Sequence, residues 1–238
     1  MAPRNASFKK IILGSSSMAR RQILSAMGFE FTVMVHLTAD IDEKSVRKEK
    51  PEDLVMALAE AKRELESLNA KGKCRGLSSN VSNIRPAFHD KRADAIISRL
   101  KNTSYLGEKE QPVLLITADT VAVFEGTVRE KPSSKEEARK YLRDYSRGHT
   151  SVLGSVVVSN LTSGNRKGGW DRAEVYFHEI PDDVIDNLIE EGIILNVSGA
   201  LMLEHPLTLP FVDTVIGTAD HVMGLSKALT EKLIQEAL

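Results

Sequence analysis

Apolar runs rich in β-branched residues alternate along this chain with segments of helical periodicity. Such alternation is typical of α/β proteins, in which helices pack against a sheet. We therefore expect a twisted mixed sheet flanked by helices, with two lobes around a central cleft. The expected strands are 10–13, 31–34, 113–118, 121–124, 127–129, 151–160, 170–178, 200–203 and 211–216, and the expected helices are 19–27, 51–62, 93–100, 135–144, 181–190 and 227–237.

The domain organisation follows from the length and from one irregular segment. A chain of 238 residues with 42% apolar content can bury a sizeable core, and we expect a single α/β domain over residues 1–238. Residues 63–92 lose helical periodicity and become rich in Gly, Ser, Asn and Lys, which predicts a disordered insertion. Deletion of this segment would join the flanking residues into one continuous helix, so we treat it as an insertion into a helix. It is either a regulatory or partner loop, or else a tolerated surface loop or a splice variant.

Charge and cysteine content exclude several classes of protein. The 32 basic residues nearly balance the 33 acidic ones, so no global basic field favours a nucleic-acid partner. The single cysteine, Cys74, excludes an internal disulfide framework and a multi-cysteine zinc site. No apolar segment approaches membrane-spanning length or the core of a signal peptide. We therefore expect a cytoplasmic protein with no membrane partner.

The first candidate site lies near the start of the chain. An apolar run ends at Gly14, three serines follow, and Arg20 and Arg21 come within the next helical turn. A strand, tight turn and helix start present unpaired N–H groups and the positive end of a helix dipole. Hydroxyls and a guanidinium gathered there suit a phosphate. The alternative is a serine N-cap on an amphipathic helix with surface arginines.

The second candidate site is acidic. Asp119 appears abruptly at the end of an apolar run, where a carboxylate can hold a divalent cation or accept a proton from water. Asp42 and Glu43 follow the second expected strand, and with Asp119 they supply enough oxygen ligands for Mg²⁺. Lys131, beside a proline, offers an ammonium that neutralises phosphate. A turn aspartate and ordinary solvated charges are the alternatives.

Several short motifs follow one another along the chain. They are Ser15-x-Ser17-x-x-Arg20, the Asp42-Glu43 turn, a helical Lys62, Ala-Asp119-Thr, Lys131-Pro, Gly-His149 and a late Met-Gly224-Leu. Taken in order, these motifs resemble the Maf family of nucleoside triphosphate pyrophosphatases. The resemblance covers nearly the whole chain except residues 63–92, and it implies a fold like that of the Maf and inosine triphosphate pyrophosphatases.

The resemblance implies hydrolysis of a nucleoside triphosphate to the monophosphate and pyrophosphate with a divalent metal ion, Mg²⁺ first and Mn²⁺ or Co²⁺ as alternatives. It implies a nucleotide substrate and admits a homodimer. His149 either orients a ligand or makes a structural hydrogen bond. The implied catalytic residues are Asp119 as proton acceptor, Glu43 and Lys131; the implied substrate-binding residues are Ser15, Ser17, Arg20, Lys62 and Lys131; and the implied metal ligands are Asp119, Asp42 and Glu43.

Three further positions bear on the preferred base. Ala19 stands where many family members have an arginine, and Glu204 stands where those members have a glutamine. A carboxylate accepts the adjacent N–H groups of a guanine edge, so Glu204 favours a guanine-type base such as that of 7-methyl-GTP. Thr120 instead matches the branch acting on dTTP and UTP.

Two other functions stay open. The family resemblance also admits a nucleotide- or nucleic-acid-binding regulator of cell division with little catalysis. The insertion favours that alternative, because it directly follows Lys62 and could displace this phosphate ligand. The chain can also be a Rossmann-like transferase that uses Gly14 as a phosphate turn, although the sequence contains no Gly-x-Gly-x-x-Gly and no Gly-Lys-Ser/Thr motif.

Overall fold

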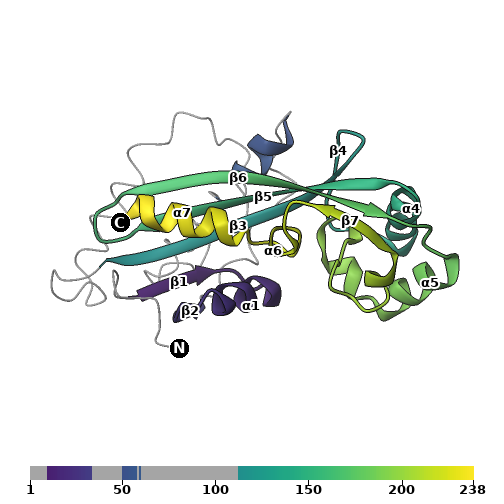
Figure 1. Cartoon of the computed structure of the whole chain (residues 1–238), viewed down its shortest axis with the longest axis horizontal. Helices are drawn as coiled ribbons and strands as arrows, with labels where there is room; N and C mark the ends of the chain where they lie inside the picture. Colours follow the sequence, from purple (N-terminus) through teal and green to yellow (C-terminus); the bar gives the residue numbers. More distant parts are fainter. Residues whose placement is uncertain (1–9, 34–49, 58, 60–111) are drawn as a thin grey trace, which may run out of the picture.

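The computed structural model describes residues 10–33, 50–57, 59 and 112–238 (Figure 1). The helix expected over 93–100, the insertion 63–92 and three predicted site residues, Asp42, Glu43 and Lys62, lie outside the described residues. Within the part described, no helix is both long and apolar enough to cross a membrane.

A seven-stranded mixed sheet organises the fold, in the order β2-β1-β3-β5-β6-β7, with β4 paired to β3. The β1 strand is parallel to β2 and β3, and the other pairs are antiparallel. The strands are β1 (Lys10–Gly14), β2 (Phe31–Val33), β3 (Val113–Phe124), β4 (Thr127–Arg129), β5 (His149–Asn160), β6 (Arg166–Phe177) and β7 (Val212–Ile216).

Serine hydroxyls begin three of the helices, because each accepts a hydrogen bond from an otherwise unpaired N–H of the first turn. Ser17 caps α1, Ser134 caps α4 and Ser226 caps α7. The helices are α1 (Met18–Ala26), a helical segment at residues 51–57 and 59, α4 (Lys135–Tyr145), α5 (Asp182–Glu191), α6 (Ala219–Val222) and α7 (Lys227–Ala237), with 3₁₀ turns η6 (Ile193–Asn196), η7 (Ser198–Ala200) and η8 (Leu209–Phe211).

Two large hydrophobic cores lie along the long axis of the molecule. One joins β1, α1 and α7 to one half of the sheet, and the other gathers α4, α5 and the 3₁₀ turns at the opposite end (Figure 1). The β3, β5 and β6 strands, of 12 residues each, pass through both ends. The two cores correspond to the two expected lobes, and the mixed sheet with flanking helices confirms the expected fold class.

Opposite faces of the sheet carry different helices. A Cβ on Gly168 of β6 would lie 3.0 Å from Cε of Met56, whereas a Cβ on the next residue, Gly169, would lie 3.1 Å from Leu229 of α7. Since consecutive strand residues point to opposite faces, the helical residues 51–57 cover one face and α7 covers the other.

Most expected elements occur within one to four residues of their predicted bounds, but two expectations are wrong. Residues 113–118 and 121–124 form one strand, because Asp119 and Thr120 between them pair with Ser155 and Gly154 of β5. The strand expected over 200–203 is replaced by η7 and a turn. Positive φ angles at Gly199 (64°) and Ala200 (53°) bend the backbone out of the extended conformation.

Candidate active site

An interruption in the sheet creates the first part of the site. On one edge of β3, pairing with β1 ends at Thr117 opposite Gly14, and pairing with β4 begins at Ala122. Among the strands that the structure describes, none pairs with residues 118–121 on this edge, and we call this interval between β1 and β4 the edge gap. Asp119 lies here, in the middle of β3, and not at the end of a strand as its sequence context predicts. The neighbouring strand β1 ends at Gly14, opposite Thr117, and so does not pair with β3 at Asp119.

Arg20 of α1 reaches into the edge gap. Its Nη2 donates to Oγ1 of Thr120 at 3.2 Å and lies 3.9 Å from Oδ1 of Asp119, while Nη1 donates to Oγ of Ser15 at 3.3 Å. The guanidinium contacts two consecutive residues of β3, whose side chains point to opposite faces, because β1 no longer covers the strand there. The structure thus brings Ser15, Arg20, Asp119 and Thr120 together.

The geometry distinguishes Arg20 from Arg21 and assigns a structural task to Ser17. Ser17 is the N-cap of α1, and its hydroxyl accepts from the backbone N–H of Arg20 at 3.4 Å. Ser15 is buried, and its hydroxyl accepts from the N–H of Ser17 at 3.2 Å. Nε of Arg21 is buried without a hydrogen-bond partner among the described residues. Arg20 is therefore the arginine of the candidate site.

Gly224, between α6 and α7, holds the arginine from the other side. Its carbonyl accepts from Nε of Arg20 at 2.9 Å. The N–H of Gly224 in turn donates to the carbonyl of His221. The ring of His221 is buried, and its Nε2 lies 3.0 Å from the carbonyl oxygen of Val152 in β5. A carbonyl only accepts, so Nε2 carries the proton. The turn is thus anchored to the sheet. The signal that the sequence offers for this contact is Gly224 in the late Met-Gly-Leu motif.

Lys131 follows β4 and is exposed, two residues after a strongly held arginine. Arg129 is buried, and its guanidinium lies over three aromatic rings, 4.2 Å from the centroid of Phe124, 4.6 Å from that of Tyr141 and 5.1 Å from that of Tyr145. Cations are attracted to ring faces, most strongly where water is excluded. The chain entering the Lys131 turn is therefore rigidly fixed.

Asp144 of α4 completes this anchor by pairing with Arg129. It also accepts from Nζ of Lys140 at 2.9 Å. Burial raises the pKa of the Asp144 carboxyl, but the hydrogen bonds from Lys140 and Arg129 outweigh burial and hold the pKa below its ordinary value of 3.8. The pair thus stays ionised at neutral pH.

Two base-specificity candidates lie on separate segments. Ala19 is half-buried in the first turn of α1, and Glu204 is exposed on the turn that follows η7. The neighbouring His205 is buried and fixes this turn, because its Nδ1 accepts from the N–H of Leu207 at 3.2 Å and its Nε2 lies 2.8 Å from Oε2 of Glu191. Glu204 thus extends outward from a well-anchored backbone.

The described residues fit a divalent cation only in part. No group of three His, Cys, Asp or Glu side chains gathers among them. Asp119 supplies one carboxylate at the edge gap, and Mg²⁺ is commonly held by one or two carboxylates together with substrate phosphates and water. The chemistry of this donor therefore suits Mg²⁺, and the other two predicted ligands lie outside the described residues.

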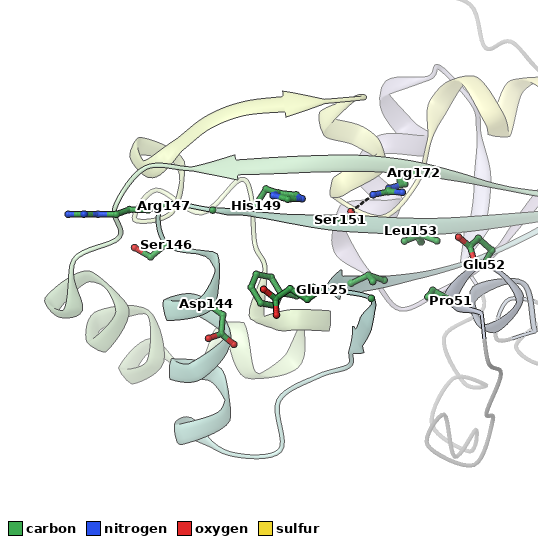
Figure 2. Close-up of a pocket in the computed structure, with 14 residues that line it drawn as sticks. Pro51, Glu52, Glu125, Asp144, Ser146, Arg147, His149, Ser151, Leu153 and Arg172 are labelled. Carbon is green, nitrogen blue, oxygen red and sulfur yellow. Dashed lines mark hydrogen bonds between the residues drawn. The ribbon is translucent and has the colours of Figure 1, made fainter.

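A cavity of about 670 Å³ lies on the face of the sheet that residues 51–57 cover (Figure 2). His149 borders it and stacks on Tyr176 of β6, with ring centroids 4.8 Å apart. Arg172 also borders it, but its Nη2 already donates to Oγ of Ser151 and to Oε1 of Glu174, both at 2.9 Å. Among the residues that the sequence singles out and the structure describes, His149 alone lines this cavity, so we place the candidate site at the edge gap.

Arg20 and Asp119, which meet at the edge gap, belong to the sequence motifs that resemble the Maf family. The Maf-like protein family model matches residues 10–237. The chain therefore belongs to the Maf-like protein family.

Proteins of stated activity are similar to this chain over nearly its whole length. A 7-methyl-GTP pyrophosphatase of Dictyostelium discoideum is 31% identical over 96% of this chain and 97% of that protein. A nucleoside triphosphate pyrophosphatase of Salinispora tropica is 28% identical over 95% of this chain and 83% of that protein. A dTTP/UTP pyrophosphatase of Psychrobacter cryohalolentis is 26% identical over 95% of this chain and 96% of that protein.

Proposed function

We propose that this protein is a nucleoside triphosphate pyrophosphatase, which hydrolyses its substrate to the nucleoside monophosphate and pyrophosphate in the cytoplasm. The observation that carries the proposal is the meeting of Arg20, Ser15 and Asp119 at the edge gap. Three relatives of this chain are named as pyrophosphatases of nucleoside triphosphates. Nearly full-length similarity to them supports the same reaction class.

Each residue of the site has a task in this reaction. Asp119 accepts a proton from the attacking water, and the water's oxygen forms a bond to the α-phosphorus as the bond to the leaving pyrophosphate breaks. Arg20 and Ser15 hold phosphate oxygens, because a guanidinium and a hydroxyl are fixed donors that need little rearrangement. Lys131 and Lys62 balance the charge of the leaving pyrophosphate.

Asp119, with Asp42 and Glu43, would hold a divalent cation, which we propose is Mg²⁺, with Mn²⁺ or Co²⁺ as substitutes. When bound, such an ion polarises a phosphoryl oxygen and neutralises part of its charge. Removal of divalent ions with EDTA should abolish turnover, and excess MgCl₂ should restore it. Full activity in EDTA would exclude a metal requirement.

For the base, we propose a guanine-type substrate such as 7-methyl-GTP. The carboxylate of Glu204 is an acceptor for the adjacent N–H groups of a guanine edge, and methylation makes that base cationic. A relative named 7-methyl-GTP pyrophosphatase, 31% identical to this chain, supports the same choice. Thr120, which matches the branch acting on dTTP and UTP, accepts from Nη2 of Arg20 and donates to the Gly224 carbonyl at 3.4 Å.

The decisive experiment measures pyrophosphate release from a panel of triphosphates: 7-methyl-GTP, GTP, ATP, CTP, UTP and dTTP. We expect the wild type to release pyrophosphate with 7-methyl-GTP ranked first, and Asp119→Asn to lower kcat by roughly 10²- to 10⁴-fold while nucleotide binding persists. Nucleotide binding by the wild type without turnover on any member of the panel would refute the enzyme and favour a nucleotide-binding regulator.

A further inference from the structure

The hydroxyl of Ser198, in η7, lies where β3 and β4 separate. It accepts from the N–H of Ala122 in β3 at 3.3 Å and donates to the carbonyl of Arg129 in β4 at 2.9 Å. Ala122 and Arg129 face each other in the β3–β4 ladder and form its last pair before the edge gap. A single side chain therefore bridges the two strands at this point.

The two strands lead directly to the predicted catalytic groups. Asp119 precedes Ala122 on β3, and Lys131 follows Arg129 beyond β4. A hydroxyl can donate one hydrogen bond while accepting another, so Ser198 ties both backbones at once. These two hydrogen bonds hold β3, which carries Asp119, close to the end of β4, which leads to the Lys131 turn.

The segment that carries Ser198 also packs tightly against β3 and against the turn that follows β4. The N–H of Gly199 donates to the carbonyl of Glu130 at 2.9 Å, and the hydroxyl of Tyr145 donates to the carbonyl of Gly199 at 3.0 Å. A Cβ on Gly199 would lie 2.4 Å from Cβ of Ala122, so only glycine allows this approach. A few residues further on, the same segment presents Glu204.

We propose that Ser198 is a positioning residue, which holds the Asp119 strand and the Lys131 turn at the separation that hydrolysis needs and ties both to the segment bearing Glu204. The inference rests on the proposed pyrophosphatase activity. Ser198 acts through the backbones of Ala122 and Arg129, because its hydroxyl is committed to them. Loss of that hydroxyl should therefore slow the chemical step more than it weakens substrate binding.

The test compares Ser198→Ala, Ser198→Thr and a matched control, Ser146→Ala. The Ser146→Ala substitution also removes a hydroxyl that accepts from a backbone N–H, that of Ile180 at 2.9 Å. The hydroxyl of Ser146, however, does not bridge β3 and β4 at the edge gap. For each variant, kcat and KM are measured on the best substrate of the panel, and Tm is measured by thermal unfolding.

We expect Ser198→Ala to lower kcat about tenfold with KM within about twofold of the wild type, since small displacements of reacting groups carry penalties of this order or more. Ser198→Thr retains the hydroxyl and should recover most of kcat. Ser146→Ala should keep the wild-type kcat even where its Tm falls.

The outcomes separate this inference from the proposed function. An unchanged kcat in Ser198→Ala overturns the positioning role and leaves the pyrophosphatase intact. Equal losses of kcat in Ser198→Ala and Ser146→Ala assign the effect to general destabilisation and overturn the positioning role. Equal losses of kcat in Ser198→Ala and Ser198→Thr assign the effect to packing and also overturn that role. Absence of turnover in the wild type refutes the proposed function itself.

Discussion

The guanidinium of Arg20 and the carboxylate of Asp119 lie 3.9 Å apart, and their side chains are only 11% and 8% exposed. They come from α1 and β3, which lie far apart in the sequence, and they meet because β1 stops short of Asp119. Opposite charges this close and this shielded from water attract each other strongly. We expect a triphosphate to compete for the guanidinium and draw it toward phosphate oxygens.

Arg20→Lys should lower kcat/KM even though the charge is kept. An ammonium cannot donate to Ser15, Thr120 and the Gly224 carbonyl from one planar group. Hydrogen bonds to charged groups contribute roughly 1.5–3 kcal/mol, which corresponds to a loss of about 10- to 100-fold. The matched control is Arg21→Lys on the same helix, for which we expect activity within about twofold of the wild type. Similar losses in both variants would contradict the assignment of Arg20.

Gly224→Ala should lower both stability and activity. The φ of Gly224 is 113°, which costs an L-residue on the order of 1–3 kcal/mol, and the new Cβ would lie 3.4 Å from Nε of Arg20. Gly126→Ala is the control, since its φ is 76° but no atom of the described residues lies within 4 Å of the new Cβ. Urea unfolding should show destabilisation in both variants, whereas kcat/KM should fall only in Gly224→Ala. Normal activity there would mean that the turn does not position Arg20.

Glu204→Gln should shift base preference from guanine toward pyrimidine triphosphates. A glutamine offers a donor and an acceptor that pair with the amide edge of uracil or thymine, whereas a carboxylate only accepts. A changed hydrogen bond to the base is expected to alter the ratio of kcat/KM for 7-methyl-GTP over UTP by about tenfold. Glu190→Gln, an exposed residue of α5, serves as the control. An unchanged ranking would show that Glu204 does not contact the base.

Asp144→Asn should remove part of the acid sensitivity of folding. The pKa of Asp144 is lowered in the folded protein, so its contribution to stability is present above the unfolded value of 3.8 and is lost as the pH falls through the folded value. The variant should lose about 1–3 kcal/mol at pH 7 and show a smaller decline below pH 3.8 than the wild type. Urea unfolding between pH 2 and pH 7 measures both.

Asp182→Asn is the comparison for that experiment. The pKa of Asp182 is also lowered, by a hydrogen bond from Arg143, but this pair is solvent-exposed and should contribute little to stability. An equal effect of the two substitutions would argue against a special anchoring role for the pair between Arg129 and Asp144.

Periodicity and capping predicted most of the fold, because those signals are local. The helices expected over 135–144 and 227–237 can be read from a few neighbouring residues and occur almost as predicted. The merging of two expected strands into β3 could not, since Asp119 and Thr120 look like a turn until their partners on β5 are known. The bend at Gly199 and Ala200 likewise depends on the distant Ala122.

For the candidate site, the sequence could propose residue types but not their partners. The residues of the first turn left both Arg20 and Arg21 as candidates, and the family resemblance named Arg20. In the structure it is Arg20 whose guanidinium donates to Thr120. The sequence indicated no role for Ser198 or for the Gly224 carbonyl, because a backbone acceptor or a bridging hydroxyl has no characteristic spacing. The roles of Asp42, Glu43 and Lys62, which lie outside the described residues, stay predictions.

The unbroken course of β3, β5 and β6 restricts how this protein can respond to a nucleotide. A hinge between the two cores would have to bend three adjacent strands of 12 residues each and stretch the hydrogen bonds that join them. Among the described elements, adjustment to the substrate should therefore come from the short turns bearing Gly224 and Glu204. Hydrogen exchange should accordingly slow at those turns when nucleotide binds, with little change along the central strands.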